Sequence, residues 1–136
     1  SLPFGGLFYF IKLIITNNKS MINLANTGTT QVILELYCNT TGDTPIYLFE
    51  VTKVGSSNSQ SFIAADNSSV PCRYQSFNII ISATENLLNG QINLSAGEYD
   101  YTVYQVTSQS LTANRVIKLQ TGILIVANSS TDSVYN

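Results

Sequence analysis

The eight carboxylates of the chain are the first residues to test for chemistry, because paired acids can transfer protons and clustered acids can bind cations. Hydrolysis of a glycosidic bond, for example, requires two carboxyl groups at one cleft. Here the acids are spread through polar loops and the outward phase of predicted strands: Glu35, Asp43, Glu50, Asp66, Glu85, Glu98, Asp100 and Asp132. Solvated surface charge explains this distribution, so we expect no catalytic carboxylate pair.

The other common catalytic and metal-binding groups are also missing from the 136-residue sequence, which contains no histidine. Histidine is the usual general base and a frequent zinc ligand. Asp43 and Asp66 offer oxygen ligands, but the alternating acid spacing of a calcium loop is absent. Serine and threonine are abundant, yet no G-x-S-x-G turn is present to expose a nucleophile. The sequence therefore predicts a non-enzymatic protein without catalytic residues, cofactor, metal or small-molecule substrate.

The cysteines and two of the tyrosines are further candidates for a redox, metal-binding or sugar-binding role. Cys38 and Cys72 are too far apart for a C-x-x-C redox pair or a zinc site, and either a disulfide or two reduced thiols fits the sequence. Tyr101 and Tyr104 could stack on a sugar, but aromatic packing between neighbouring strands is the simpler explanation. The absence of tryptophan further weakens the sugar-binding interpretation.

The composition favours a structural or binding protein. Only 10% of the residues are charged, compared with about 25% in an average soluble domain. Asparagine, serine and threonine take the place of the missing charges. The basic residues are too few and too scattered to form a nucleic-acid surface: Lys12, Lys19, Lys53, Arg73, Arg115 and Lys118.

These side chains would be positioned by short strands, because helical periodicity is almost absent. Residues 31–37, 46–51, 61–64, 77–82, 91–94, 98–106, 116–119 and 123–126 have strand-like composition. Asn89-Gly90 predicts a hairpin turn, and Thr121-Gly122 predicts a bulge or bend. Seven or eight short strands separated by turn residues are typical of an all-β, antiparallel immunoglobulin-like sandwich.

The segment from Leu94 to Tyr104 predicts a structural corner between the two sheets. Gly97 supplies backbone freedom where the chain turns, and Tyr99 follows at the start of an alternating strand. We expect the Tyr99 ring to lie in the core, near Leu94, with its hydroxyl bonded to upstream backbone.

The sequence predicts one domain at 21–127, preceded by an apolar arm or first strand at 1–20 and followed by a polar tail at 128–136. The arm contains an apolar run that is too short to span a membrane: Leu7, Phe8, Phe10, Ile11, Leu13 and Ile15. We hypothesise that it adds a strand to the sheet edge of a neighbouring copy. An alternative is that Met21 is the natural start of the protein.

Five stretches of the sequence carry a resemblance to a known group of proteins. They are Met21-Ile22-Asn23-Leu24, Pro45-Ile46-Tyr47-Leu48-Phe49-Glu50, Pro71-Cys72-Arg73-Tyr74, Gly97-Glu98-Tyr99-Asp100-Tyr101-Thr102-Val103-Tyr104 and Thr121-Gly122-Ile123-Leu124-Ile125-Val126. Together they resemble small β-rich virion proteins of tailed phages that infect Bacteroidetes, such as the auxiliary capsid proteins of crAss-like phages. The resemblance covers most of 21–127.

The resemblance implies a protein on the capsid surface that decorates or reinforces the shell. Its partners would then be the major capsid protein or copies of itself, with no nucleic acid and no membrane. Two alternatives stay open from the sequence. One is a secreted or cell-surface binding module, such as an adhesin or a carbohydrate-binding domain. The other is a subunit of a phage head fibre or tail.

Overall fold

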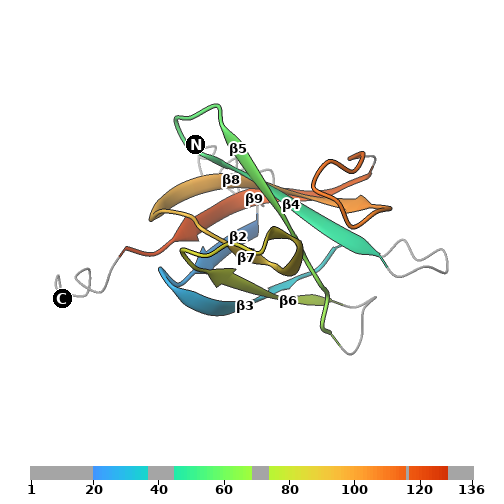
Figure 1. The fold of residues 1–136 in the computed structure, drawn as a ribbon, viewed down its shortest axis with the longest axis horizontal. Coiled ribbons are helices and arrows are strands. Elements are labelled where there is room, and N and C mark those ends of the chain that lie inside the picture. Colours follow the sequence, from blue (N-terminus) through green and yellow to red (C-terminus); the bar gives the residue numbers. More distant parts are fainter. Residues whose placement is uncertain (1–19, 37–44, 69–73, 116, 129–136) are drawn as a thin grey trace, which may run out of the picture.

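A computed structural model describes residues 20–36, 45–68, 74–115 and 117–128. Over these residues the chain forms two facing β-sheets (Figure 1). The strands are β2 (Ser20–Leu24), β3 (Gly28–Leu34), β4 (Ile46–Lys53), β5 (Ser59–Ala64), β6 (Gln75–Ile81), β7 (Gln91–Ile92), β8 (Gly97–Val106) and β9 (Ile117–Val126). A short 3-10 helix, η1 (Leu87–Asn89), precedes β7. The predicted all-β class is confirmed.

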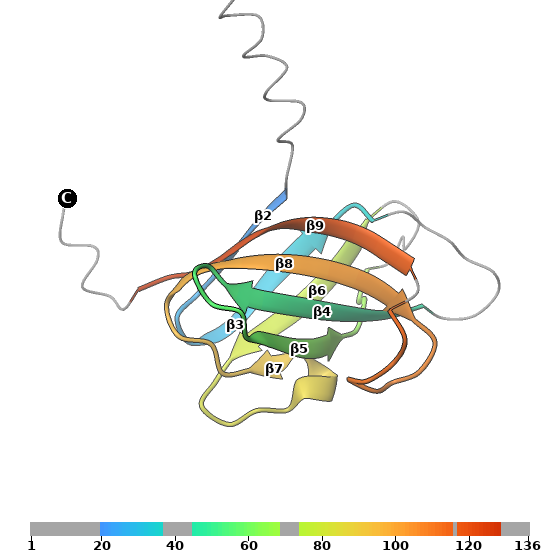
Figure 2. The ribbon, with the colours of Figure 1, turned by 90° about the horizontal axis from the view of Figure 1, so that it is seen from above.

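The larger sheet has five strands in the order β2-β9-β8-β4-β5, and the smaller has three in the order β3-β6-β7. Figure 2 shows the larger sheet running from β9 through β8 and β4 to β5. Strand alternation supplies the surface between the two sheets. In β8, for instance, Tyr99, Tyr101 and Val103 are buried, whereas Asp100, which lies between the two tyrosines, is exposed.

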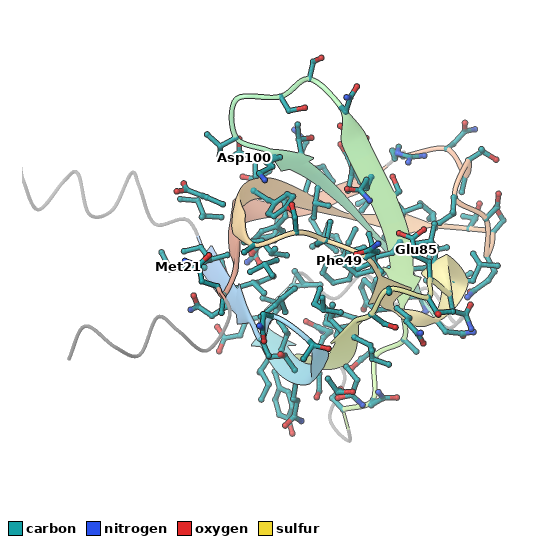
Figure 3. All side chains as sticks on the ribbon, turned by 60° about the vertical axis from the view of Figure 1, so that its left-hand side comes forward. Met21, Phe49, Glu85 and Asp100 are labelled. Atoms are coloured by element: carbon teal, nitrogen blue, oxygen red, sulfur yellow. The ribbon has the colours of Figure 1, made fainter. Side chains whose placement is uncertain are left out.

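Aromatic contacts at Phe49 join the two sheets at the centre of the core. Phe49 is fully buried on β4 (Figure 3) and stacks on Phe62 of the neighbouring β5, with ring centroids 5.0 Å apart. It also meets the edge of Phe77 on β6 of the opposite sheet at 5.1 Å. Offset-stacked and edge-to-face pairs are the favoured aromatic geometries, so these contacts stabilise the packing of one sheet on the other.

The expectation of purely antiparallel sheets is wrong at two places. β2 runs parallel to β9, in register from Ser20 opposite Gly122 to Leu24 opposite Val126. β7 runs parallel to β6, with Ile80 opposite Gln91. Residue alternation identifies a strand without specifying the direction of its partner. The sequence reasoning also does not identify β2 as a separate strand.

The hairpin predicted at Asn89-Gly90 is wrong, although the dipeptide does lie in a tight turn. The Asn86 N–H donates to the Gln91 carbonyl at 2.9 Å, and the Gln91 N–H donates to the Asn86 carbonyl at 3.1 Å. This small loop lets β7 return parallel to β6. Gly90 has φ 76°, and a Cβ there would lie 2.9 Å from the Asn78 carbonyl oxygen. Both the backbone conformation and the close approach therefore require glycine.

The bulge predicted at Thr121-Gly122 is also wrong, because both residues pair regularly with β8. The two predicted strands 116–119 and 123–126 are instead one strand, β9. Its irregularity comes earlier: Val103 pairs with Gln120 and Tyr104 pairs with Lys118, which leaves Leu119 as the extra residue.

Candidate functional site

Two of the candidate carboxylates, Asp66 and Glu85, accept hydrogen bonds from backbone N–H groups of nearby loops and strands. Asp66 accepts hydrogen bonds from the backbone N–H groups of Ser68 at 2.9 Å and Ser76 at 3.0 Å. Glu85 accepts the Asn93 N–H at 3.1 Å. Within the described ranges, no group of three or more metal-ligating side chains lies close enough together to hold an ion. Asp43 and Asp132 fall outside those ranges. The contacts of Asp66 and Glu85 therefore stabilise loops.

Tyr99 has the surroundings expected of the corner. Its side chain is buried, and its hydroxyl donates to the Ser95 carbonyl at 2.7 Å. Leu94 is buried in the same main core cluster as Tyr99, and Gly97 has φ 146°. Lys53 extends over the same turn, with its Nζ 6.0 Å from the centre of the Tyr99 ring. The corner thus links the loop before β8 to the core.

Tyr101 is not available for stacking on a sugar. Its side chain is only 1% exposed, and its hydroxyl donates to Gln120 Oε1 at 3.0 Å. Burial raises the pKa of this hydroxyl above its ordinary value, with a smaller opposing effect from a hydrogen bond to the Ser20 side chain. The ring also lies against Gly122, where an added Cβ would collide with the Ser20 carbonyl oxygen. Tyr101 is a packing residue.

Tyr104 belongs to a second apolar cluster on the outer face of the five-stranded sheet. It packs beside the buried side chains of Leu48, Ile63 and Val106. The connection between β8 and β9 contributes Ala113 and covers this cluster. Cross-strand packing, the simpler of the two interpretations of Tyr104, accounts for these contacts.

Arg115 links the connection between β8 and β9 to the five-stranded sheet through hydrogen bonds and an ion pair. Its Nη2 donates to Ser61 Oγ at 3.1 Å, and its Nη1 donates to the Ala113 carbonyl at 2.9 Å. Its Nε lies 3.7 Å from Glu50 Oε1. Part of this outer face is therefore occupied by the chain itself.

The flank formed by β2 and β3, in contrast, is not covered by another described part of the chain. We call it the open flank. Each strand is the end strand of its sheet, and the two contact each other across the sandwich. At the other side of the molecule, the end strand β5 contacts η1 and β6. The open flank has no such covering element among the described residues.

The hydrogen-bond pattern shows which backbone groups of β3 face away from its sheet. On β6, the N–H groups of Ile80 and Ser82 donate toward the β7 side, at 2.8 and 3.1 Å. Alternate residues of a strand face opposite neighbours, so the odd-numbered residues of β6 face β3. Their partners in register are Gly28, Thr30, Val32 and Leu34. The N–H and C=O groups of Thr29, Gln31 and Ile33 therefore point outward.

The same argument applies to β2. The Ala127 N–H donates to the Leu24 carbonyl at 3.0 Å, so the even-numbered residues of β2 face β9. The backbone groups of Met21 and Asn23 then face the open flank. Met21 is 56% exposed on β2 (Figure 3), and Ile33 is 58% exposed on β3. Two of the four exposed large apolar side chains in the described part of the chain thus lie on these two strands.

β3 lacks the features that usually protect an edge strand. Its seven residues, GTTQVIL, include no lysine, no proline and no charged residue. Its pairing with β6 runs without a register shift over all seven. Lysine, proline, bulges and short length are the common means of blocking unwanted pairing. The uncharged, β-branched composition of 28–34 indicates a strand, but the sequence alone does not show that this strand lies at the edge of its sheet.

Several predicted residues fall outside the described part of the chain. These are the arm residues Leu7, Phe8, Phe10, Ile11, Leu13 and Ile15, together with Cys38 and Cys72. No helix in the described residues is long and apolar enough to cross a membrane. No known protein family matches this sequence, and no curated protein matches it.

Proposed function

We propose that this protein is a non-enzymatic structural component of a phage virion, an auxiliary protein that decorates or reinforces the capsid. Its partners in this role are the major capsid protein or further copies of the chain. The sequence resemblance to small virion proteins supports the class of protein. The open flank supports an assembly role, and it is the observation on which the proposal rests. An unprotected edge strand pairs readily with another chain.

We also propose that the sandwich is of the immunoglobulin-like type. The order β9-β8-β4-β5 corresponds to strands G, F, C and C′ of such a domain, and β3 next to β6 corresponds to B next to E. Tyr99, at the start of β8, donates its hydroxyl to backbone four residues upstream. This is the hydrogen bond of a tyrosine corner, which supports the assignment.

The uncharged outer face of the smaller sheet supports the same role. Gln31, Ile33, Asn78 and Ile80 lie on it, and none carries a charge. The outer face of an antiparallel sheet in a freely soluble protein is normally polar and solvated. Covering uncharged side chains costs less hydration than covering charged ones, which suits close packing against a partner.

The proposal is tested on purified virions from a phage that carries this gene. Quantitative mass spectrometry should find the chain at a fixed copy ratio to the major capsid protein, through successive density-gradient purifications. Electron microscopy of the same particles should place it on the head. A chain that is lost on purification, or that is found in the culture medium apart from particles, would contradict the virion role.

A further inference from the structure

We propose that the β3 edge receives residues 7–15 of a second copy of this chain as an added strand. The structure defines the receiving side: the outward backbone groups of Thr29, Gln31 and Ile33. This inference rests on the proposed structural role for its biological setting, but it is tested on the purified chain alone.

The receiving edge is long enough and regular enough to bind a strand. Seven residues of β3 pair in unbroken register with β6, so its free side is equally regular. Three residues with outward N–H and C=O groups offer up to six backbone hydrogen bonds, since each presents one donor and one acceptor. The exposed Ile33 side chain adds an apolar contact beside them. Backbone pairing of this kind, with side-chain contacts for selectivity, is the mode of strand addition.

The segment Leu7 to Ile15 has the composition of a buried strand. Its nine residues, LFYFIKLII, are apolar except for one lysine. Beside β3, one face of the added strand would extend the core-facing side of the smaller sheet, and the other would lie next to the exposed Ile33. Lys12 is its only charge, and the exposed Glu35 directly follows β3 on the receiving side. Length and charge therefore match the receiving edge.

A second copy fits this edge better than the same copy does. The five chain steps from Ile15 to Ser20 span at most about 18 Å when fully extended. Ser20 lies in the larger sheet, whereas β3 lies in the smaller one. Facing sheets are about 10 Å apart, so a same-chain arm would have to reverse direction and cross between sheets within those few residues. Pairing with its own β2 would meet outward backbone groups of only Met21 and Asn23.

The test uses two variants, a receiver and a donor, each of which lacks one side of the proposed contact. The receiver lacks residues 1–16 and keeps β3; the donor keeps the arm and carries Ile33→Lys, which replaces the apolar contact beside the added strand with a charge that disfavours edge pairing. We expect the full chain to associate in light-scattering measurements, and the receiver alone to be monomeric. The donor, which is the full chain with Ile33→Lys, should self-associate at least about tenfold more weakly than the unmodified chain. Mixing donor and receiver should form 1:1 complexes.

The matched control is Asn78→Lys, which places the same charge on the same outer face. Asn78 is exposed and pairs with Gln31, but it lies on β6, inside the sheet. This variant should associate like the unmodified chain. Thermal denaturation of every variant checks that each one folds. A monomeric full chain, a receiver that associates as strongly as the full chain, or equal effects of Ile33→Lys and Asn78→Lys would each overturn the inference.

The two proposals fail in different ways. A chain that is present on virions but monomeric after purification would retain the virion role and reject the strand addition. A chain that associates through β3 but is absent from virions would do the reverse.

Discussion

At the scale of single residues, Gly122 shows how the absence of a side chain allows β2 to pair closely with β9 beside the Tyr101 ring. It pairs with Ser20 on β2 and lies under the Tyr101 ring. In Gly122→Ala, the new Cβ would collide with the Ser20 carbonyl oxygen and lie 2.8 Å from the ring. We expect a loss of about 1–3 kcal/mol in the free energy of unfolding, as is usual for overpacking. Chemical denaturation measures it.

The neighbouring Thr121→Ala is the control for that experiment, because Thr121 is exposed on the same strand. Its effect should stay within about 0.5 kcal/mol, the usual range for surface substitutions. Equal stability of the two variants would show that β2 or the Tyr101 ring moves aside without cost.

The Tyr99 hydroxyl makes a separate contribution at the corner. Tyr99→Phe keeps the buried ring but removes the donor to the Ser95 carbonyl. We expect the free energy of unfolding to fall by about 1 kcal/mol, the typical net value of one hydrogen bond. Tyr104→Phe, in the second apolar cluster, serves as the comparison and should change stability less. A Tyr99→Phe variant as stable as the unmodified protein would exclude an energetic role for this hydrogen bond.

The buried Tyr101 hydroxyl predicts a dependence of stability on alkaline pH. Burial raises the pKa of the Tyr101 hydroxyl above the ordinary tyrosine value of 10.0. The unfolded chain therefore loses this proton first, so the stabilisation is complete below pH 10.0 and is lost as pH rises from there through the higher folded-state pKa. Denaturation curves across this range should show a smaller loss for Tyr101→Phe. An identical loss in both proteins would contradict the assignment to Tyr101.

At the scale of elements, much of the strand content could be predicted from the sequence, whereas the pairing could not. β4 and β8 begin within one residue of their predicted positions, because alternation and turn residues are local signals. The parallel partners of β2 and β6 depend on contacts between distant segments. The turn predicted at Asn89-Gly90 is present, but there it ends the short helix η1 and does not form a hairpin between two antiparallel strands. Local sequence specifies a turn more closely than it specifies which strands the turn connects.

The candidate site follows the same division. Tyr99 and its upstream hydrogen bond could be expected from the spacing of Gly97 and Tyr99. The open flank could not, because an edge is defined by the strands that are absent beside it. The strand order in each sheet, together with the contact between β2 and β3, shows that these two end strands lie on the same side.

The connection between β8 and β9 gives a prediction at the same scale. Arg115 joins this connection to Ser61 and Glu50 on the outer face. Since these contacts are partly exposed, Arg115→Ala should lower global stability by about 1 kcal/mol or less. Its main effect should be faster amide hydrogen exchange in residues 107–115, measured by mass spectrometry. Lys118→Ala, an exposed charge on β9, is the control; equal exchange in both variants would reject the fastening role.

At the scale of the whole molecule, the distribution of charge predicts how self-association responds to salt. The receiving strand, Gly28–Leu34, carries no charge, and the contacts proposed there are backbone hydrogen bonds and apolar packing. Added salt screens charged contacts strongly and leaves such contacts largely unchanged. The dissociation constant of the full chain should therefore change by less than about threefold between low and high salt. An exposed ion pair between Lys12 and Glu35 would account for a weakening of this small size. Analytical ultracentrifugation over a salt series measures this, with Glu35→Gln as the matched variant. Association that weakens by about a hundredfold or more across the series would mean that the charged residues hold the copies together, and that the uncharged β3 edge does not.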